Sequence, residues 1–144
     1  MKHEYWINVT HADNRLVIYL DGEIIWDSNI THDDPEMNHF INITEGLEEH
    51  SRHTNELIFE GFNDHYGEKH DDGDFNYWHF TYRVFRRDIN DAGEVTAETD
   101  ILEPFNERHL SNPNITAIEN VYHIVLKDGK YRVMQNSLKK NFYK

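Results

Sequence analysis

Cysteine is absent from all 144 positions of the sequence. This absence excludes disulfide bonds, thiol catalysis and thiolate sites for zinc or iron–sulfur clusters. Any bound metal ion would therefore need histidine, carboxylate, carbonyl or water ligands.

Long apolar runs are absent too, and the longest ones span only a few residues. A transmembrane helix needs about 20 consecutive apolar residues, so we expect no membrane insertion. The segment from Met1 to Trp6 leads directly into a strand-like pattern without the apolar region of a signal peptide. We therefore expect a cytoplasmic protein, while a removed signal peptide or non-classical export would leave the same sequence.

Basic residues are scarce: 14 lysines and arginines stand against 27 acidic residues, which gives a net charge of −13. This balance argues against nucleic-acid binding through a general electrostatic surface. It reverses in residues 127–144, which hold six basic residues and one acidic residue. The acidic body could attract cations or a basic protein partner, or it could simply keep a small protein soluble.

Aromatic residues make up 13% of the chain, which separates it from disordered sequences of similar charge. At this length one domain buries roughly 68% of the surface that the unfolded chain exposes. We therefore predict a single domain over residues 1–144, with a core in 1–86 and a C-terminal extension in 87–144.

Alternating apolar and polar residues predict β-strands along most of the sequence. Asp21-Gly22 and Asp128-Gly129 stand between such runs and predict two β-hairpins. We expect a short turn at Thr44–Leu47, one helical turn between Pro104 and Pro113, and a short helix or frayed tail over residues 136–144. The strands are predicted at residues 3–10, 15–20, 23–26, 37–43, 55–62, 75–86, 120–126 and 130–134, with a weak one at 94–101.

Many short strands separated by turns favour an all-β fold, a two-sheet antiparallel sandwich of jelly-roll-like type with a C-terminal hairpin. The longest predicted strand, 75–86, has one apolar face and one face that is exposed to solvent or contacts a ligand. The residues predicted to share one core are Trp78, Phe80, Tyr82, Val84, Leu57, Phe59, Ile41, Ile43, Leu16 and Ile18.

The acidic loop, residues 63–74, holds five carboxylates and two histidines between two predicted strands. Their mutual repulsion would be relieved by a hard cation, and calcium accepts six to eight oxygen ligands in irregular loops. The predicted ligands are Asp64, Glu68, Asp71, Asp72 and Asp74. Two alternatives stay open: a solvated loop without a ligand, and a zinc or nickel site that uses His65, His70 and His79.

Two segments, Phe40–Leu47 and Asn55–Phe59, resemble jelly-roll sugar-binding modules. The acidic loop is similar to the calcium loop of the soluble bacterial calcium-dependent galactophilic lectins. That resemblance, over about residues 40–86, implies ligand positions at Asp64, Glu68, Asp71 and Asp72. The family has Thr and paired Asn where this chain has Glu68, Asp71 and Asp72, and its final strand ends the protein, whereas here 58 residues follow Arg86.

The resemblance implies a calcium-assisted carbohydrate-binding module or lectin, in which two sugar hydroxyls complete the calcium sphere. An aromatic ring, that of Tyr66, Tyr77 or Trp26, could stack on the sugar, although for Trp26 a place in the core is favoured. The residues that we expect at the ligand are Tyr66, His65, His70, Tyr77, His32 and Asp33.

We predict that the protein is not an enzyme, because it has no nucleophile elbow, phosphate-binding glycine loop or HExxH motif. No carboxylate pair stands out as a glycosidase dyad. The main rival is a small acidic protein that neutralises a basic partner, as immunity proteins do. A third reading is a subunit of a larger assembly or homo-oligomer that docks through its basic C-terminal hairpin. The first two readings differ in whether the acidic residues converge on one ion or spread over a surface.

Overall fold

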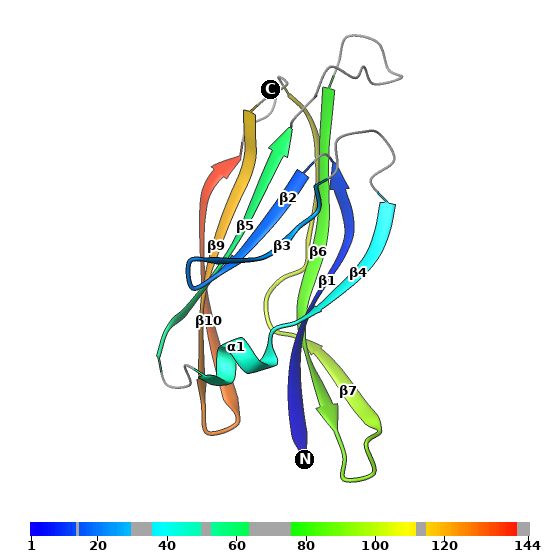
Figure 1. Ribbon diagram of the computed structural model, residues 1–144, viewed down its shortest axis with the longest axis vertical. Helices are drawn as coiled ribbons and strands as arrows, with labels where there is room; N and C mark the ends of the chain where they lie inside the picture. The colour runs from blue at the N-terminus through cyan, green and yellow to red at the C-terminus, as the bar shows by residue number, and fades with distance from the viewer. Residues whose placement is uncertain (14, 30–35, 50–52, 64–75, 112–114, 141–144) are drawn as a thin grey trace.

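The structure, a computed structural model, describes residues 1–13, 15–29, 36–49, 53–63, 76–111 and 115–140; side chains are left out at 36, 76–77, 110–111, 115 and 136–140. Within these ranges two antiparallel sheets pack against each other (Figure 1). This arrangement confirms the predicted all-β sandwich. No helix in the described ranges is long and apolar enough to span a membrane.

The first sheet is centred on β1 and the long strand β6, which pair along most of their length. Its strands are β4 (Glu36–Asn42), β1 (Lys2–Asp13), β6 (Asn76–Ile89), β7 (Val95–Asp100) and β8 (Phe105–Ser111). β7 and β8 pair with successive parts of the same edge of β6. The hairpin of β6 and β7 projects from the body (Figure 1), and all six residues of β7 are exposed.

The second sheet contains strands from both ends of the sequence. In spatial order its strands are β10 (Lys130–Lys140), β9 (Ile115–Lys127), β5 (Asn55–Asn63), β2 (Arg15–Leu20) and β3 (Glu23–Asp27). The segment after Arg86 is thus built into the sandwich, because β9 lies between β5 and β10. Ile118, Tyr122 and Ile124 of β9 belong to the hydrophobic core.

Both predicted hairpins are present, and their turn residues explain why. Asp21 and Gly22 have φ of 51° and 85°, and Asp128 and Gly129 have φ of 51° and 75°. Two consecutive positive φ angles give the type I′ turn, whose twist matches that of the flanking strands. The glycine in each pair adopts this conformation without steric cost.

The predicted core is confirmed. Nine of its ten residues are buried in one cluster, and Ile41 is partly buried against that cluster. The inward face of β6 supplies Trp78, Phe80 and Tyr82, which follow the period of two that identifies the strand in the sequence.

Three local predictions were wrong. Residues 105–111 form β8 instead of a helical turn, because pairing with β6 overrides a polar and proline-flanked sequence. β10 continues to Lys140, so residues 136–140 are not helical. Residues 44–49 form α1 (Thr44–Glu49) instead of a turn, and the Leu47 side chain of this helix is buried. The Tyr5 backbone N–H donates to Thr44 Oγ1 at 2.8 Å, which ties the start of α1 to β1.

Candidate functional site

The predicted calcium and sugar site lies almost entirely outside the described residues. β5 ends at Asn63 and β6 begins at Asn76, on either side of the acidic loop. The Tyr77 backbone pairs with that of Leu110 between β6 and β8. The Tyr77 side chain lies outside the part of the chain that the structure describes. The residues beyond the description are Asp64, His65, Tyr66, Glu68, His70, Asp71, Asp72, Asp74, His32 and Asp33.

The structure describes two further candidates, Trp26 and His79, and both pack against other protein side chains. Trp26 packs against the core and stacks on His39, with ring centroids 4.7 Å apart. His79 stacks on His11 at 4.2 Å, and its Nε2 lies 3.1 Å from both Asn106 Oδ1 and Thr81 Oγ1. In the part of the chain that the structure describes, no three His, Asp or Glu residues gather where they could hold a metal ion.

A pocket of about 310 Å³ lies where β8, at the edge of the first sheet, faces β9 and β10 of the second. We call it the tyrosine pocket. Its lining residues are Glu103, Pro104, Phe105, Asn106, Glu107, Asn120, Tyr122 and Gln135. They come from three strands and the turn before β8, so the pocket is built largely on rigid elements.

A buried hydrogen-bonded group forms the floor of the tyrosine pocket. The hydroxyls of Tyr82 and Tyr122 are 2.6 Å apart, and the Asn120 amide donates to the Tyr82 hydroxyl at 2.8 Å. Tyr82 and Tyr122 are each 1% exposed, and Asn120 is 2% exposed. The two hydroxyls carry two hydrogens, and their mutual bond uses only one. One hydroxyl hydrogen thus remains to donate to another acceptor.

Aromatic packing fixes these hydroxyls in place. The Phe59 ring of β5 stacks on Tyr82 at 3.7 Å and meets Tyr122 edge-on at 5.7 Å. Phe105 of β8 also stacks on Tyr82, with ring centroids 5.1 Å apart. Packed rings restrict the side-chain rotamers, so the polar groups at the pocket floor are held in one arrangement.

Burial also sets the protonation state of the pocket. Burial, with a smaller contribution from the nearby Glu107 carboxylate, raises the pKa of Tyr122 to about 12 and that of Tyr82 well above the ordinary tyrosine value. Both phenols therefore stay neutral through the physiological range. Neutral phenols at this floor act as hydrogen-bond donors and acceptors rather than as nucleophiles.

The strand register directs a mixed set of groups toward the pocket. Phe105 and Glu107 lie opposite the inward residues Tyr82 and Phe80, and Gln135 lies opposite Tyr122. The pocket thus combines carboxamides, two carboxylates, a phenol and an aromatic ring. Such a set can exchange hydrogen bonds in both directions and cover an apolar surface.

Sequence reasoning missed this pocket, although one signal was present. Asn120 occupies an inward position in β9, in phase with Ile118, Tyr122 and Ile124. An amide at such a position in an apolar alternation indicates a buried polar group that needs partners.

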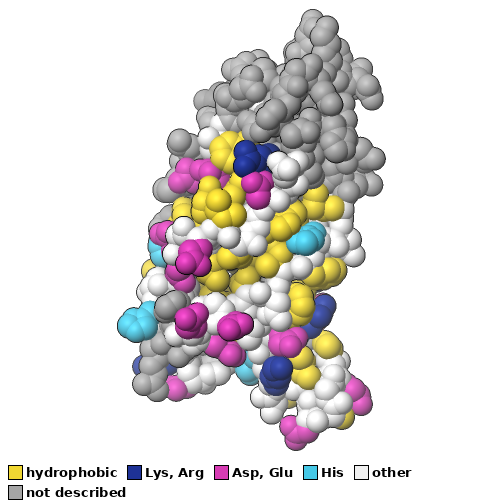
Figure 2. Space-filling view, viewed as in Figure 1, with side chains coloured by type: hydrophobic (Ala, Val, Ile, Leu, Met, Phe, Trp, Pro, Cys, Tyr) yellow, Lys and Arg dark blue, Asp and Glu magenta, His cyan; other side chains and the backbone are white. Residues whose placement is uncertain are grey.

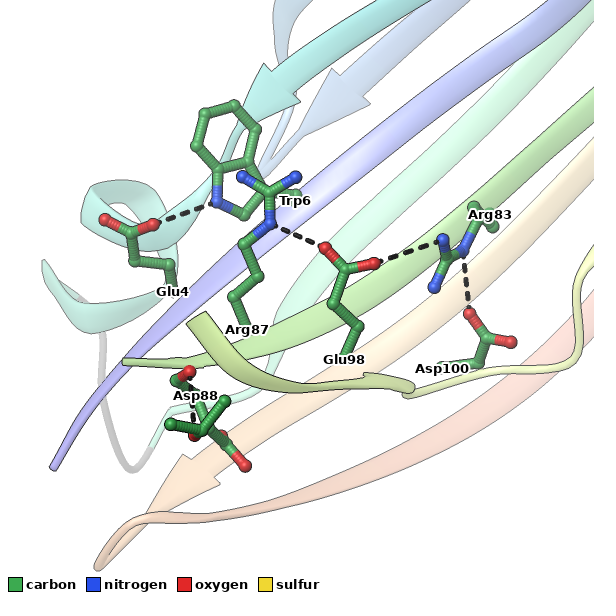
Figure 3. Close-up of polar contacts among 8 residues, drawn as sticks. Glu4, Trp6, Arg83, Arg87, Asp88, Glu98 and Asp100 are labelled. Atoms are coloured by element: carbon green, nitrogen blue, oxygen red, sulfur yellow. Dashed lines mark hydrogen bonds and ion pairs between the residues drawn. The ribbon is translucent and has the colours of Figure 1, made fainter. Parts of the chain in front are cut away.

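A second polar surface lies on the outer face of the first sheet (Figure 3). Arg87 Nε donates to Glu98 Oε2 at 2.8 Å, and Arg83 Nε donates to Asp100 Oδ1 at 2.9 Å. The Arg87 guanidinium lies over the Trp6 ring, 5.1 Å from its centroid. The arginines are therefore held between carboxylates and rings on this face.

A hollow of about 800 Å³ lies beside these ion pairs, at the start of β1 and along α1. We call it the acidic hollow. Its lining residues are Lys2, Glu4, Asn42, Thr44, Glu45, Glu48 and Glu49. Trp6 Nε1 donates to Glu4 at 3.2 Å, and Trp6 meets the ring of Phe40, which is 41% exposed, edge-on at 6.4 Å. Figure 2 shows carboxylates spread around hydrophobic side chains on one face of the molecule.

No family model matches this chain, and neither does any curated protein or solved structure. The likeness to jelly-roll lectins therefore stays a prediction.

Proposed function

We propose that this protein is a carbohydrate-binding module, without catalytic activity, that holds one sugar unit in the tyrosine pocket. The observation that carries the proposal is the buried polar floor made by Tyr122 and Asn120 in an open pocket. Buried polar groups are costly unless they are hydrogen-bonded, and this floor keeps one hydroxyl hydrogen for a further acceptor.

The chemistry of the lining suits a ligand rich in hydroxyl groups. Sugar hydroxyls both donate and accept, so they can pair with the amides of Asn120 and Gln135 and with the Glu107 carboxylate. The ring of Phe105 offers an apolar surface for the C–H face of the sugar. The volume, about 310 Å³, lies at the lower end of the range for small-molecule pockets and suits a single sugar unit.

Calcium remains part of the proposal through the acidic loop. The loop's five carboxylates are of the type that calcium prefers. The tyrosine pocket uses none of them, so its binding of sugar should not require the ion.

Replacing Gln135 by alanine is expected to weaken sugar binding about tenfold, because one hydrogen bond of about 1.4 kcal/mol is lost. A glycan array on the wild-type protein would identify the sugar, and titration calorimetry would measure its affinity. Met134→Ala is the matched control, because Met134 neighbours Gln135, pairs with His123 and is 56% exposed.

Each outcome of that experiment has a defined meaning. Loss of affinity in Gln135→Ala alone, unchanged by a calcium chelator, would support the tyrosine pocket. Loss of binding with the chelator alone would move the site to the acidic loop. An array without any bound glycan would remove the carbohydrate proposal.

A basic protein partner is the second candidate, and the acidic hollow favours it. Four carboxylates surround this hollow, next to the exposed ring of Phe40. Aromatic rings with charged rims are common at protein interfaces, where complementary charge speeds association.

The double variant Glu45→Gln with Glu48→Gln should bind a decalysine peptide threefold to tenfold more weakly, because exposed charge pairs contribute roughly 0–1 kcal/mol each. The control, Asp91→Asn with Glu94→Gln, removes the same charge from the exposed turn between β6 and β7. Equal losses in both variants, measured by fluorescence anisotropy at fixed ionic strength, would show attraction to net charge alone.

A further inference from the structure

Three lysines line another pocket, at the end of the sandwich where β1 begins (Figure 1). It has a volume of about 430 Å³ and lies between the start of β1, α1 and the turn between β9 and β10. We call it the lysine pocket, after Lys2, Lys127 and Lys130. It stands out because the chain as a whole carries a net charge of −13.

The strongest feature of the lysine pocket is a direct pairing of like charges. Lys127 and Lys130 flank the Asp128-Gly129 turn and lie opposite each other in the β9–β10 register. Like charges in this position repel and destabilise a hairpin. Two carboxylates at the pocket, Asp128 and Glu48, offset part of this repulsion.

The wall made by β1 adds hydrogen-bonding groups that suit an anion. His3 lines the pocket, and its Nδ1 lies 2.7 Å from Asp88 Oδ1, which fixes the orientation of the ring. Asp88 Oδ1 also lies 3.0 Å from Arg86 Nε, so this carboxylate is shared between the His3 ring and the Arg86 guanidinium. The Tyr5 side chain lines the pocket beside them.

Two carboxylates, Glu48 and Asp128, also line the pocket. Three lysines outnumber them, and His3 adds a further positive charge whenever it is protonated. Lys2 Nζ lies 3.7 Å from Glu4 Oε2 and forms an ion pair with it. Lys127 and Lys130 are therefore the two lysines best placed to bind one anion together.

We propose that the lysine pocket binds a small oxyanion, a phosphate, sulfate or carboxylate group, between Lys127 and Lys130. An anion placed there would turn the repulsion of the two lysines into two attractive contacts. The Tyr5 hydroxyl and His3 would supply hydrogen bonds to the remaining oxygens. This site is independent of the tyrosine pocket and of any sugar.

The test compares phosphate, sulfate, acetate and chloride at equal ionic strength, with the full chain and melting temperature as the readout. Phosphate or another of the oxyanions should raise the melting temperature more than chloride does. In calorimetry, Lys127→Gln and Lys130→Gln should each weaken binding of that oxyanion at least fivefold. Arg132→Gln, on the same strand and outside the lysine pocket, should leave it unchanged.

Both lysines are exposed beside a turn, so neither variant should prevent folding. In chloride alone, the variants should melt at the same or a higher temperature than wild type, because the repulsion is removed. Equal effects of all four anions, or an equal loss in Arg132→Gln, would overturn the proposal in favour of general charge screening.

Discussion

Replacing Phe59 by alanine is expected to lower the free energy of unfolding by about 3–5 kcal/mol. Phe59 has no exposed surface, and its ring stacks on Tyr82 while meeting Tyr122 edge-on. Its removal would leave a cavity under both tyrosines, and a strand within a sheet cannot move in to fill it. Urea denaturation followed by tryptophan fluorescence measures the loss.

A second substitution of Phe59 tests how the core supports the tyrosine pocket. Phe59→Leu keeps most of the volume but not the ring stacking, so it should lose less stability and still loosen the tyrosine hydroxyls. Phe40→Ala is the control, because Phe40 is partly exposed on the outer face. A loss below about 1 kcal/mol for Phe59→Ala would contradict the packing described here.

Replacing Gly61 by alanine is expected to cost about 3 kcal/mol, the upper end of the range for overpacked cores. An added Cβ would lie 2.6 Å and 2.7 Å from ring atoms of Phe80 and 2.8 Å from Ile118. Phe80 and Ile118 are buried between the sheets, so neither can move aside freely. Thermal and urea denaturation of the variant would measure the cost.

Gly46→Ala provides the matched control. Its added Cβ would meet only the end of the Leu20 side chain at 2.6 Å, which can rotate, and alanine favours the helix at this position of α1. We expect a change within about 1 kcal/mol. Phe80→Leu should relieve part of the Gly61→Ala cost, and strict additivity of the two changes would contradict the steric explanation.

The sequence predicts features that depend on neighbouring residues. The two hairpins follow from Asp-Gly pairs between alternating runs, and the inward face of β6 follows from its period of two. β8 was missed because its polar residues form a strand only through pairing with β6. The paired residues are 23 positions apart for Tyr82 and Phe105 and 35 positions apart for Asn76 and Ser111, beyond the reach of local patterns.

The tyrosine pocket could not be predicted for a related reason. It joins Tyr82, Glu107, Tyr122 and Gln135, which four different strands bring together. Their proximity depends on the registers between β6 and β8 and between β9 and β10, which one sequence does not determine. The acidic loop, by contrast, was found from local charge density, and its metal site stays a prediction.

The position of β9 between β5 and β10 has a consequence for the order in which the protein can fold. β5 pairs with β9 between residues 55–63 and 115–124, so this edge of β5 has no partner until residue 124 has left the ribosome. Until then, the edge of β5 is open to pairing with other chains. Sandwiches with such distant pairings fold in milliseconds to seconds. A nascent chain of this protein therefore needs protection from aggregation until β9 has been synthesised.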